Sequence, residues 1–235
     1  MKRSLKTAFS FRLMTIVLGG PYVLWTLPSA LLLAQSEYYR FVTIEQISHK
    51  LTHFRAPDYV FIGDSITAGG RAWWIRLNQS PFSSLNLGAN GYTVRQVNFL
   101  LKKALSYDPK IIFVMAGTND LFNPEVSNQM IEEDWFALVK TAKEASFNSL
   151  VVTGIPITAD KTNDKRIEEL NLFLEKLCED NEYKFINLNQ SINQSINQSI
   201  LSESSLERKE FFTDGVHFSD KTYQLWSQEI IRILD

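Results

Sequence analysis

The chain has 235 residues, of which 45% are hydrophobic and 21% are charged, so it holds enough apolar material for one sizeable globular core. Of its 24 basic residues, four lie in residues 1–34, which hold no acid, so the remainder carries 20 basic against 26 acidic residues. An acidic body lacks the basic patch that phosphate groups require, and we expect no nucleic-acid partner. The single cysteine, Cys178, excludes an intramolecular disulfide.

The first segment, residues 1–34, consists of a basic tail and an uncharged, mostly apolar run over residues 13–34. The run is about as long as a bilayer-spanning helix needs to be, and a basic tail stays in the cytoplasm. We therefore expect an N-terminal hydrophobic anchor helix that holds the body on the extracytoplasmic side of the membrane. The alternative is a cleaved signal peptide and a secreted or periplasmic protein, because glycines and prolines interrupt the run.

Residues 35–57 are predicted to form a juxtamembrane helix and linker. Apolar residues recur at helical spacing over residues 44–54, and Pro57 marks the end of the helix. We expect this segment to pack on the body or on the membrane surface.

The body, residues 58–235, alternates short apolar runs with amphipathic segments. The predicted strands cover residues 58–63, 84–88, 110–116, 149–154 and 183–188, and the predicted helices cover residues 71–79, 93–106, 127–146, 162–181 and 219–234. This alternation predicts an α/β domain in which helices cover both faces of a parallel five-stranded sheet. Ligands bind beyond the carboxyl ends of such strands, and Ser65, Gly91 and Asn119 each follow a predicted strand.

A repeat over residues 189–200 reads Asn-Gln-Ser-Ile three times. In a helix, its isoleucines would share one face because they are four residues apart. One interpretation is a tandem expansion tolerated in a surface connection, and the other is a lid over the site.

Two motifs supply the parts of a nucleophilic site. Ser65 follows an apolar run and precedes a predicted helix, so its hydroxyl would stand at the edge of the sheet near helix amides that favour an anion. Asp214 lies three residues before His217, a spacing that lets the carboxylate reach Nδ1 of the ring. The ring would then turn Nε2 toward the serine, as a general base requires.

Donors for a developing oxyanion are also present. Asn119 offers a side-chain amide, Gly91 offers a backbone N–H without side-chain obstruction, and the Ser65 N–H would complete the set. No metal site is predicted, because His49 and His53 form the only close histidine pair and have no neighbouring cysteine or HExxH-type acid.

Taken together, these motifs resemble those of the SGNH hydrolase superfamily, the GDSL esterases and lipases, over residues 58–235. The matching blocks, in family order, are Gly63-Asp64-Ser65-Ile66-Thr67, the glycine block at Gly91 (with Gly88 a second register), Gly117-Thr118-Asn119-Asp120, and Asp214 with His217. The sequence departs from the family pattern at Phe218-Ser219, which affects only the entry to the last helix.

The resemblance implies a three-layer α/β/α, flavodoxin-like fold and hydrolysis of carboxylic esters through an acyl-serine. It implies Ser65, Asp214 and His217 as catalytic residues, Ser65, Gly91 and Asn119 as the oxyanion hole, and no metal or cofactor. The substrate would be a small-molecule, lipid or glycan ester. The alternative is an O-acyltransferase acting on a cell-envelope glycan or lipid, since the same residues would serve both reactions.

Overall fold

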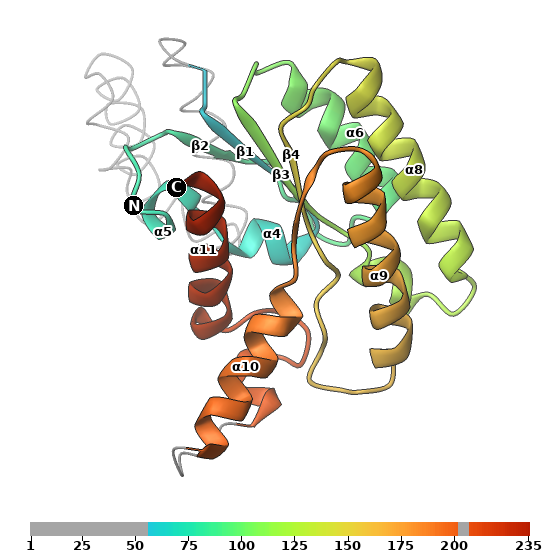
Figure 1. Cartoon of the computed structure of the whole chain (residues 1–235), viewed down its shortest axis with the longest axis vertical. Coiled ribbons are helices and arrows are strands. Elements are labelled where there is room, and N and C mark those ends of the chain that lie inside the picture. Colours follow the sequence, from blue (N-terminus) through green and yellow to red (C-terminus); the bar gives the residue numbers. More distant parts are fainter. Residues whose placement is uncertain (1–55, 202–206) are drawn as a thin grey trace, which may run out of the picture.

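The computed structural model describes residues 56–201 and 207–235, which form an α/β domain (Figure 1). The predicted anchor over residues 13–34 lies outside the described residues, and so does almost all of the predicted juxtamembrane segment over residues 35–57. Among the helices of the described ranges, none has both the length and the apolar character needed to span a membrane.

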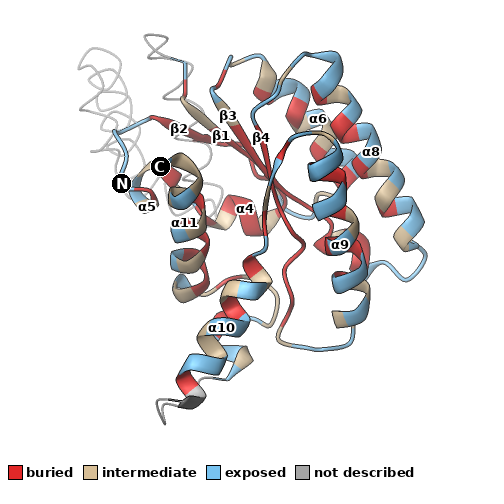
Figure 2. Cartoon of the chain, in the orientation of Figure 1, coloured by how far each residue is buried: buried red, intermediate tan, exposed pale blue. Residues whose placement is uncertain are grey.

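Five parallel strands form a single sheet in the order β2-β1-β3-β4-β5, the order of flavodoxin-like folds. The strands are β1 (Tyr59–Gly63), β2 (Ser84–Asn86), β3 (Ile111–Met115), β4 (Leu150–Thr153) and β5 (Lys184–Ile186). Each strand lies inside its predicted range, so the predicted five-stranded parallel sheet is confirmed. The apolar runs of β1, β3 and β4 are buried almost throughout because helices cover both faces of the sheet (Figure 2).

Helices flank the sheet on both sides (Figure 1). The helical elements are α4 (Ser65–Gly69), α5 (Trp73–Arg76), α6 (Val94–Leu105), α7 (Thr118–Phe122), α8 (Asn128–Glu144), α9 (Asp164–Asp180), α10 (Leu188–Leu201), the 3-10 turn η2 (Arg208–Phe211) and α11 (Asp220–Leu234). Helices α6, α8 and α9 lie on one side of the sheet, and α5 and α11 lie on the other. The predicted helices over residues 93–106, 127–146, 162–181 and 219–234 correspond to α6, α8, α9 and α11.

The predicted helix over residues 71–79 is shorter than expected. Only α5 is helical there, because Arg71 and Asn78 adopt left-handed backbone conformations with φ of 60° and 51°. An α-helix requires negative φ at every residue, so these two residues limit it at both ends. The sequence pattern alone could not show this restriction.

A stack of aromatic rings fixes α5 and α11 to the sheet. The ring of Phe61 on β1 stacks on Trp73 at 4.3 Å and on Phe113 of β3 at 4.7 Å between centroids. Trp73 in turn meets Trp226 of α11 edge to face at 4.7 Å. Buried aromatic pairs of this kind contribute about 0.5–1.5 kcal/mol each beyond their area burial.

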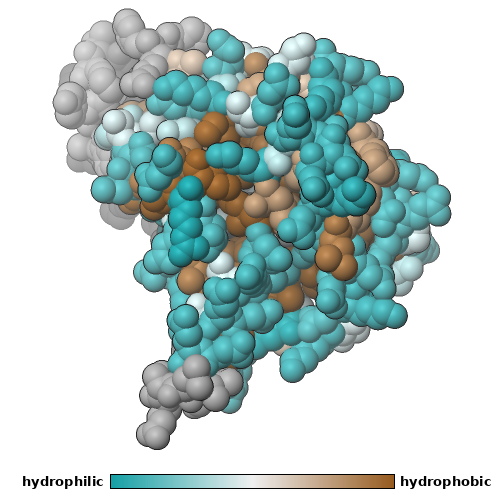
Figure 3. All heavy atoms as spheres, in the orientation of Figure 1, coloured by the Kyte–Doolittle hydropathy of each residue, from teal (hydrophilic) through white to brown (hydrophobic). Residues whose placement is uncertain are grey.

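On the surface, hydrophilic residues dominate the visible face, and hydrophobic ones gather in a band between α11 and α9 (Figure 3).

The repeat forms helix α10, which packs beside α11. Leu188 and Ile192 are buried on its inner face, whereas Ile196 is only partly buried. The side chain of Asn189 accepts the Ile157 N–H at 2.9 Å and donates to the Ile155 carbonyl at 2.9 Å. Ile192 of the repeat therefore belongs to the core, whereas Ile196 packs only partly against it.

The repeat offers an internal control for the contribution of this packing. Replacing Ile192 with alanine should lower the free energy of unfolding by about 2–4 kcal/mol, because the side chain is 0% exposed and would leave a cavity. Ile196→Ala makes the same chemical change in the same helix at a partly buried site, so its loss should be clearly smaller. Urea denaturation measures both values, and equal losses would contradict this account of α10.

Candidate active site

Ser65 occupies the sharp turn from strand β1 into helix α4. A Cβ on Gly63 would lie 2.1 Å from Thr67 Oγ1 and 2.2 Å from the Met115 carbonyl oxygen, so only glycine fits there. The next residue, Asp64, caps α4 by accepting the Ile66 N–H at 2.9 Å. Ser65 is thereby the first residue of a helix at the carboxyl edge of the sheet, as the sequence predicts.

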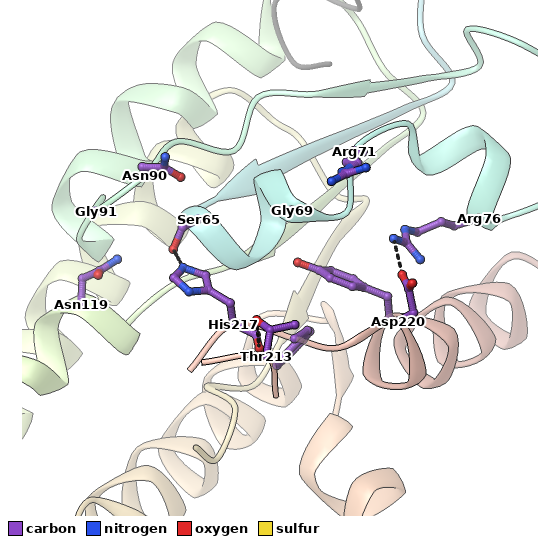
Figure 4. A pocket seen from close by; sticks show the side chains of 12 residues that line it. Ser65, Gly69, Arg71, Arg76, Asn90, Gly91, Asn119, Thr213, His217 and Asp220 are labelled. Carbon is purple, nitrogen blue, oxygen red and sulfur yellow. Dashed lines mark hydrogen bonds and ion pairs between the residues drawn. The ribbon is translucent and has the colours of Figure 1, made fainter. Parts of the chain in front are cut away.

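Asp214 and His217 lie in the loop between η2 and α11. Asp214 Oδ1 accepts the backbone N–H groups of Val216 at 3.0 Å and His217 at 2.8 Å, and Oδ2 lies 2.7 Å from His217 Nδ1. On the other side of the ring, His217 Nε2 lies 2.9 Å from Ser65 Oγ (Figure 4). The three predicted catalytic side chains therefore form one continuous hydrogen-bonded chain.

The loop that carries the histidine is closed by backbone hydrogen bonds. The Thr213 N–H donates to the His217 carbonyl at 2.8 Å, and Phe212 and Phe218 form an antiparallel bridge at its base. Gly215 has φ of 93°, which favours glycine, and its carbonyl accepts the Ala159 N–H at 2.8 Å. These contacts fix the ring of the histidine relative to the sheet.

The carboxyl groups of Asp214 and Asp64, both near Ser65, have opposite shifts of their pKa. Partial burial opposes ionisation of Asp214, but hydrogen bonds from the His217 backbone, the His217 ring and the Val216 N–H outweigh it and lower the pKa to about 2. Burial raises the pKa of the Asp64 carboxyl to about 7, against the hydrogen bonds from Ile66 and Thr67. Asp214 is therefore an anion at neutral pH, whereas Asp64 is partly protonated.

Gly91 and Asn119 lie on the other side of Ser65 in the same pocket (Figure 4). Gly91 has φ of 73°, and apart from its chain neighbours no atom of the described residues lies within 4 Å of where its Cβ would be. Asn119 Nδ2 donates to the Tyr92 carbonyl at 2.9 Å, which ties α7 to the loop that carries Gly91. One N–H of the Asn119 amide is used in this bond, so the second can serve a bound ligand.

Asp120 also holds the loop that carries Gly91, because its buried carboxylate accepts the Val94 N–H at 3.1 Å.

The second register of the glycine block, Gly88, has a different environment from Gly91. Its N–H donates to Asn86 Oδ1 at 2.9 Å, and a Cβ there would lie 2.4 Å from the Ala68 nitrogen. Gly88 thus serves packing, while Gly91 faces the pocket.

The pocket has a volume of about 790 Å³. Ser65, Gly91, Asn119 and His217 line it, and Asp214 reaches it through the histidine ring. Among the described residues, its lining comes from both sides of the sheet edge and includes none of helix α10, which argues against the lid interpretation of the repeat. The described residues hold no group of three or more potential metal ligands, and His49 and His53 lie outside them.

Two structural residues of the site escaped the sequence analysis. Asn86, fully buried at the end of β2, donates Nδ2 to the Thr67, Ala68 and Arg71 carbonyls at 3.1, 3.2 and 3.0 Å, which secures the end of α4. Tyr223 of α11 donates its hydroxyl to the Ile66 carbonyl at 2.7 Å. The available signal for Asn86 was a polar side chain within a predicted strand. Tyr223 gave no separate signal, because it fits the pattern of an amphipathic helix.

A hydrogen-bonded Ser–His–Asp chain at the carboxyl edge of a parallel sheet is the arrangement found in hydrolases with a serine nucleophile. The model of the GDSL-like lipase/acylhydrolase family matches residues 61–225. The chain belongs to this family, as the resemblance of its motifs implies. No curated protein matches the chain in sequence.

Solved structures share the fold at low sequence identity. A GDSL-like lipase from Bacteroides thetaiotaomicron is 18% identical, with a TM-score of 0.62 over 83% of this chain and 98% of that one. A catalytic mutant of an acetylxylan esterase from Geobacillus stearothermophilus is 17% identical, with a TM-score of 0.62 over 76% and 94%. The catalytic domain of a peptidoglycan O-acetyltransferase from Streptococcus pneumoniae is 18% identical, with a TM-score of 0.54 over 77% and 93%.

The buried carboxyl of Asp64 should give the protein a pH-dependent stability. Its pKa is about 7 in the folded state and about 3.9 in an unfolded chain, so the folded state holds the proton more tightly. The stabilisation is complete below pH ~4 and is lost as the pH rises toward ~7. Asp64→Asn keeps an oxygen for the Ile66 N–H but cannot ionise, so its stability relative to wild type should increase from pH 4 to pH 8.

Unfolding free energies at several pH values measure this difference. Asp108→Asn is the matched control, because it makes the same change at an exposed carboxyl and should follow the wild-type profile. If the unfolding free energies of wild type and Asp64→Asn changed with pH in parallel, the raised pKa of Asp64 would be contradicted.

Proposed function

We propose that the protein is a serine esterase that cleaves carboxylic esters through an acyl-serine intermediate. The observation that supports it is the chain from Asp214 Oδ2 to His217 Nδ1 at 2.7 Å and from His217 Nε2 to Ser65 Oγ at 2.9 Å, which opens into a pocket. This geometry is what a serine nucleophile and its general base require.

In the first half of the reaction, Ser65 Oγ attacks the ester carbonyl carbon while His217 Nε2 takes the hydroxyl proton. Asp214, ionised because of its low pKa, accepts a hydrogen bond from His217 Nδ1–H and stabilises the cationic ring. The carbonyl oxygen gains the negative charge and is held by the N–H groups of Ser65 and Gly91 and by the Asn119 amide. His217 then returns its proton to the departing alcohol.

In the second half, His217 takes a proton from water, and the hydroxide attacks the acyl-serine. The acid leaves, and the proton returns to Ser65 Oγ. Side chains and water supply every proton in this scheme, so it requires no metal or cofactor.

O-acyl transfer is the second candidate. A structural neighbour is the catalytic domain of a peptidoglycan O-acetyltransferase, and a pocket of about 790 Å³ has room for an acceptor beside the serine. A hydroxyl of a cell-envelope glycan or lipid would then replace water in the second half. Incubation with p-nitrophenyl acetate and an acceptor sugar separates the two: hydrolysis yields free acetate, and transfer yields acetylated sugar in proportion to p-nitrophenol.

Ser65→Ala should lower kcat for p-nitrophenyl acetate by at least about 10⁴-fold, because the covalent route loses its nucleophile. The thermal unfolding midpoint should stay close to wild type, since the side chain points into a pocket. Ser80→Ala changes an exposed serine outside the pocket and should retain full activity. A Ser65→Ala variant with near wild-type turnover would overturn the proposed function.

Asn119→Ala should lower kcat by about 10²–10³-fold with little change in KM, because the amide acts on the charge that develops in the transition state. Asn119→Asp keeps the size of the side chain but removes its donors, so it should lose at least as much activity. Asn148→Ala, at an exposed loop position, is the control. A change confined to KM would make Asn119 a substrate-binding residue instead.

A further inference from the structure

Two arginines lie in the same pocket as the proposed catalytic residues. Arg71 follows helix α4, and Arg76 is the last residue of α5. In Figure 4 both lie beyond Gly69, on the opposite side of Ser65 from Gly91 and Asn119. The pocket is therefore polarised, with oxyanion donors at one end and guanidinium groups at the other.

The surrounding structure holds Arg76 in place. Its Nε donates to the Gly70 carbonyl at 2.8 Å, its Cζ lies 4.5 Å from the centroid of the Tyr223 ring, and a terminal nitrogen lies 3.4 Å from Asp220 Oδ1. The Arg76 side chain is only 22% exposed. Tyr223 is itself fixed through its hydrogen bond to α4, so the guanidinium is preorganised against the wall of the pocket.

Arg71 is held through its backbone. It has φ of 60°, a conformation that is uncommon for a residue with a long side chain, and its carbonyl accepts Asn86 Nδ2 at 3.0 Å. Glycine or asparagine would adopt this turn at lower cost. This turn places the Arg71 side chain in the lining of the pocket.

The charge of this end of the pocket contrasts with that of the protein. In the part of the chain that the structure describes, the lining carries two guanidinium groups against one carboxylate, that of Asp220. Asp220 is 90% exposed, and its contact with Arg76 at 3.4 Å is long, so it leaves the guanidinium donors available to a ligand. The positive arginine end of the pocket, in an acidic body, favours an anion at that end.

We propose that the pocket binds esters whose alcohol part carries an anionic group, a phosphate or a carboxylate, which Arg71 and Arg76 hold. This inference rests on the proposed function. The carbonyl oxygen must face Gly91 and Asn119, and the leaving oxygen must face His217 Nε2 to receive its proton. The alcohol then extends away from the oxyanion donors, toward the arginines. Guanidinium groups suit both anions because they form paired hydrogen bonds to two oxygens.

Matched pairs of esters test the charge and its position. Monoacetylglycerol phosphate against monoacetylglycerol, and 3-acetoxybenzoate against its methyl ester, place a phosphate or a carboxylate on the alcohol. The mono-p-nitrophenyl ester of succinate against p-nitrophenyl butyrate places the charge on the acyl part. The full chain should show a higher kcat/KM for the anionic member of an alcohol-side pair, and added salt should reduce this preference.

Arg71→Gln should reduce the ratio of anionic to neutral kcat/KM by up to about fivefold, the upper end of the range expected for one exposed charge–charge contact. Arg71→Lys should retain part of the preference, because it keeps the charge but not the paired hydrogen bonds. Arg95→Gln is the control: Arg95 lies on α6, is exposed, pairs with Asp134 and lies outside the pocket lining, so both rates should match wild type.

The outcomes separate the two proposals. Equal rates within each alcohol-side pair, a ratio unchanged by Arg71→Gln, or a preference confined to the succinate ester would overturn the anionic-alcohol inference and leave the esterase proposal standing. Failure of the wild-type protein to hydrolyse any of the six esters would overturn the esterase proposal and this inference with it. The phosphate and carboxylate pairs show which of the two anions is preferred.

Discussion

The site depends on the close approach of backbone segments at the end of strand β1. Gly63 leaves room for Thr67 and the Met115 carbonyl, and Gly88 leaves room for the backbone of Ala68. A side chain at either glycine would collide with main-chain atoms, which cannot move aside as a flexible side chain can. The position of Ser65 therefore follows from packing around the turn rather than from contacts of the serine itself, and the other site residues are arranged around this fixed point.

The histidine reaches that point through helix α11. His217 is 152 residues from Ser65 in sequence, so the contact depends on how firmly α11 is docked. Trp226 donates Nε1 to Thr153 Oγ1 at 3.0 Å, and Tyr223 bonds to α4. These buried hydrogen bonds have a defined geometry that apolar packing alone lacks, because leaving either donor unpaired in the interior costs about 1–3 kcal/mol. They orient the helix, and the helix orients the loop before it.

Much of this arrangement could be predicted from the sequence, because strand periodicity and the carboxyl-edge rule bring Ser65, Gly91 and Asn119 together. The short helix α7 and the lengths of α4 and α5 could not, since backbone turns such as the left-handed Arg71 leave no periodic signal. Arg71 and Arg76 were also invisible as pocket residues. An arginine in a polar stretch has the same pattern whether it faces solvent or a cavity, and only the packing of α11 against α5 decides which.

The two carboxyl groups beside the serine–histidine pair, those of Asp214 and Asp64, differ in their pKa because their surroundings differ. Asp214 is exposed enough to remain hydrated, and N–H donors favour its anion, so its pKa lies at about 2. Asp64 is 1% exposed, and its Oδ2 has no hydrogen-bond partner among the described residues, so its pKa lies at about 7. Only the first can therefore supply a permanent negative charge beside the His217 ring. Asp64 caps the helix that begins at Ser65, and its burial limits the negative charge placed next to that residue.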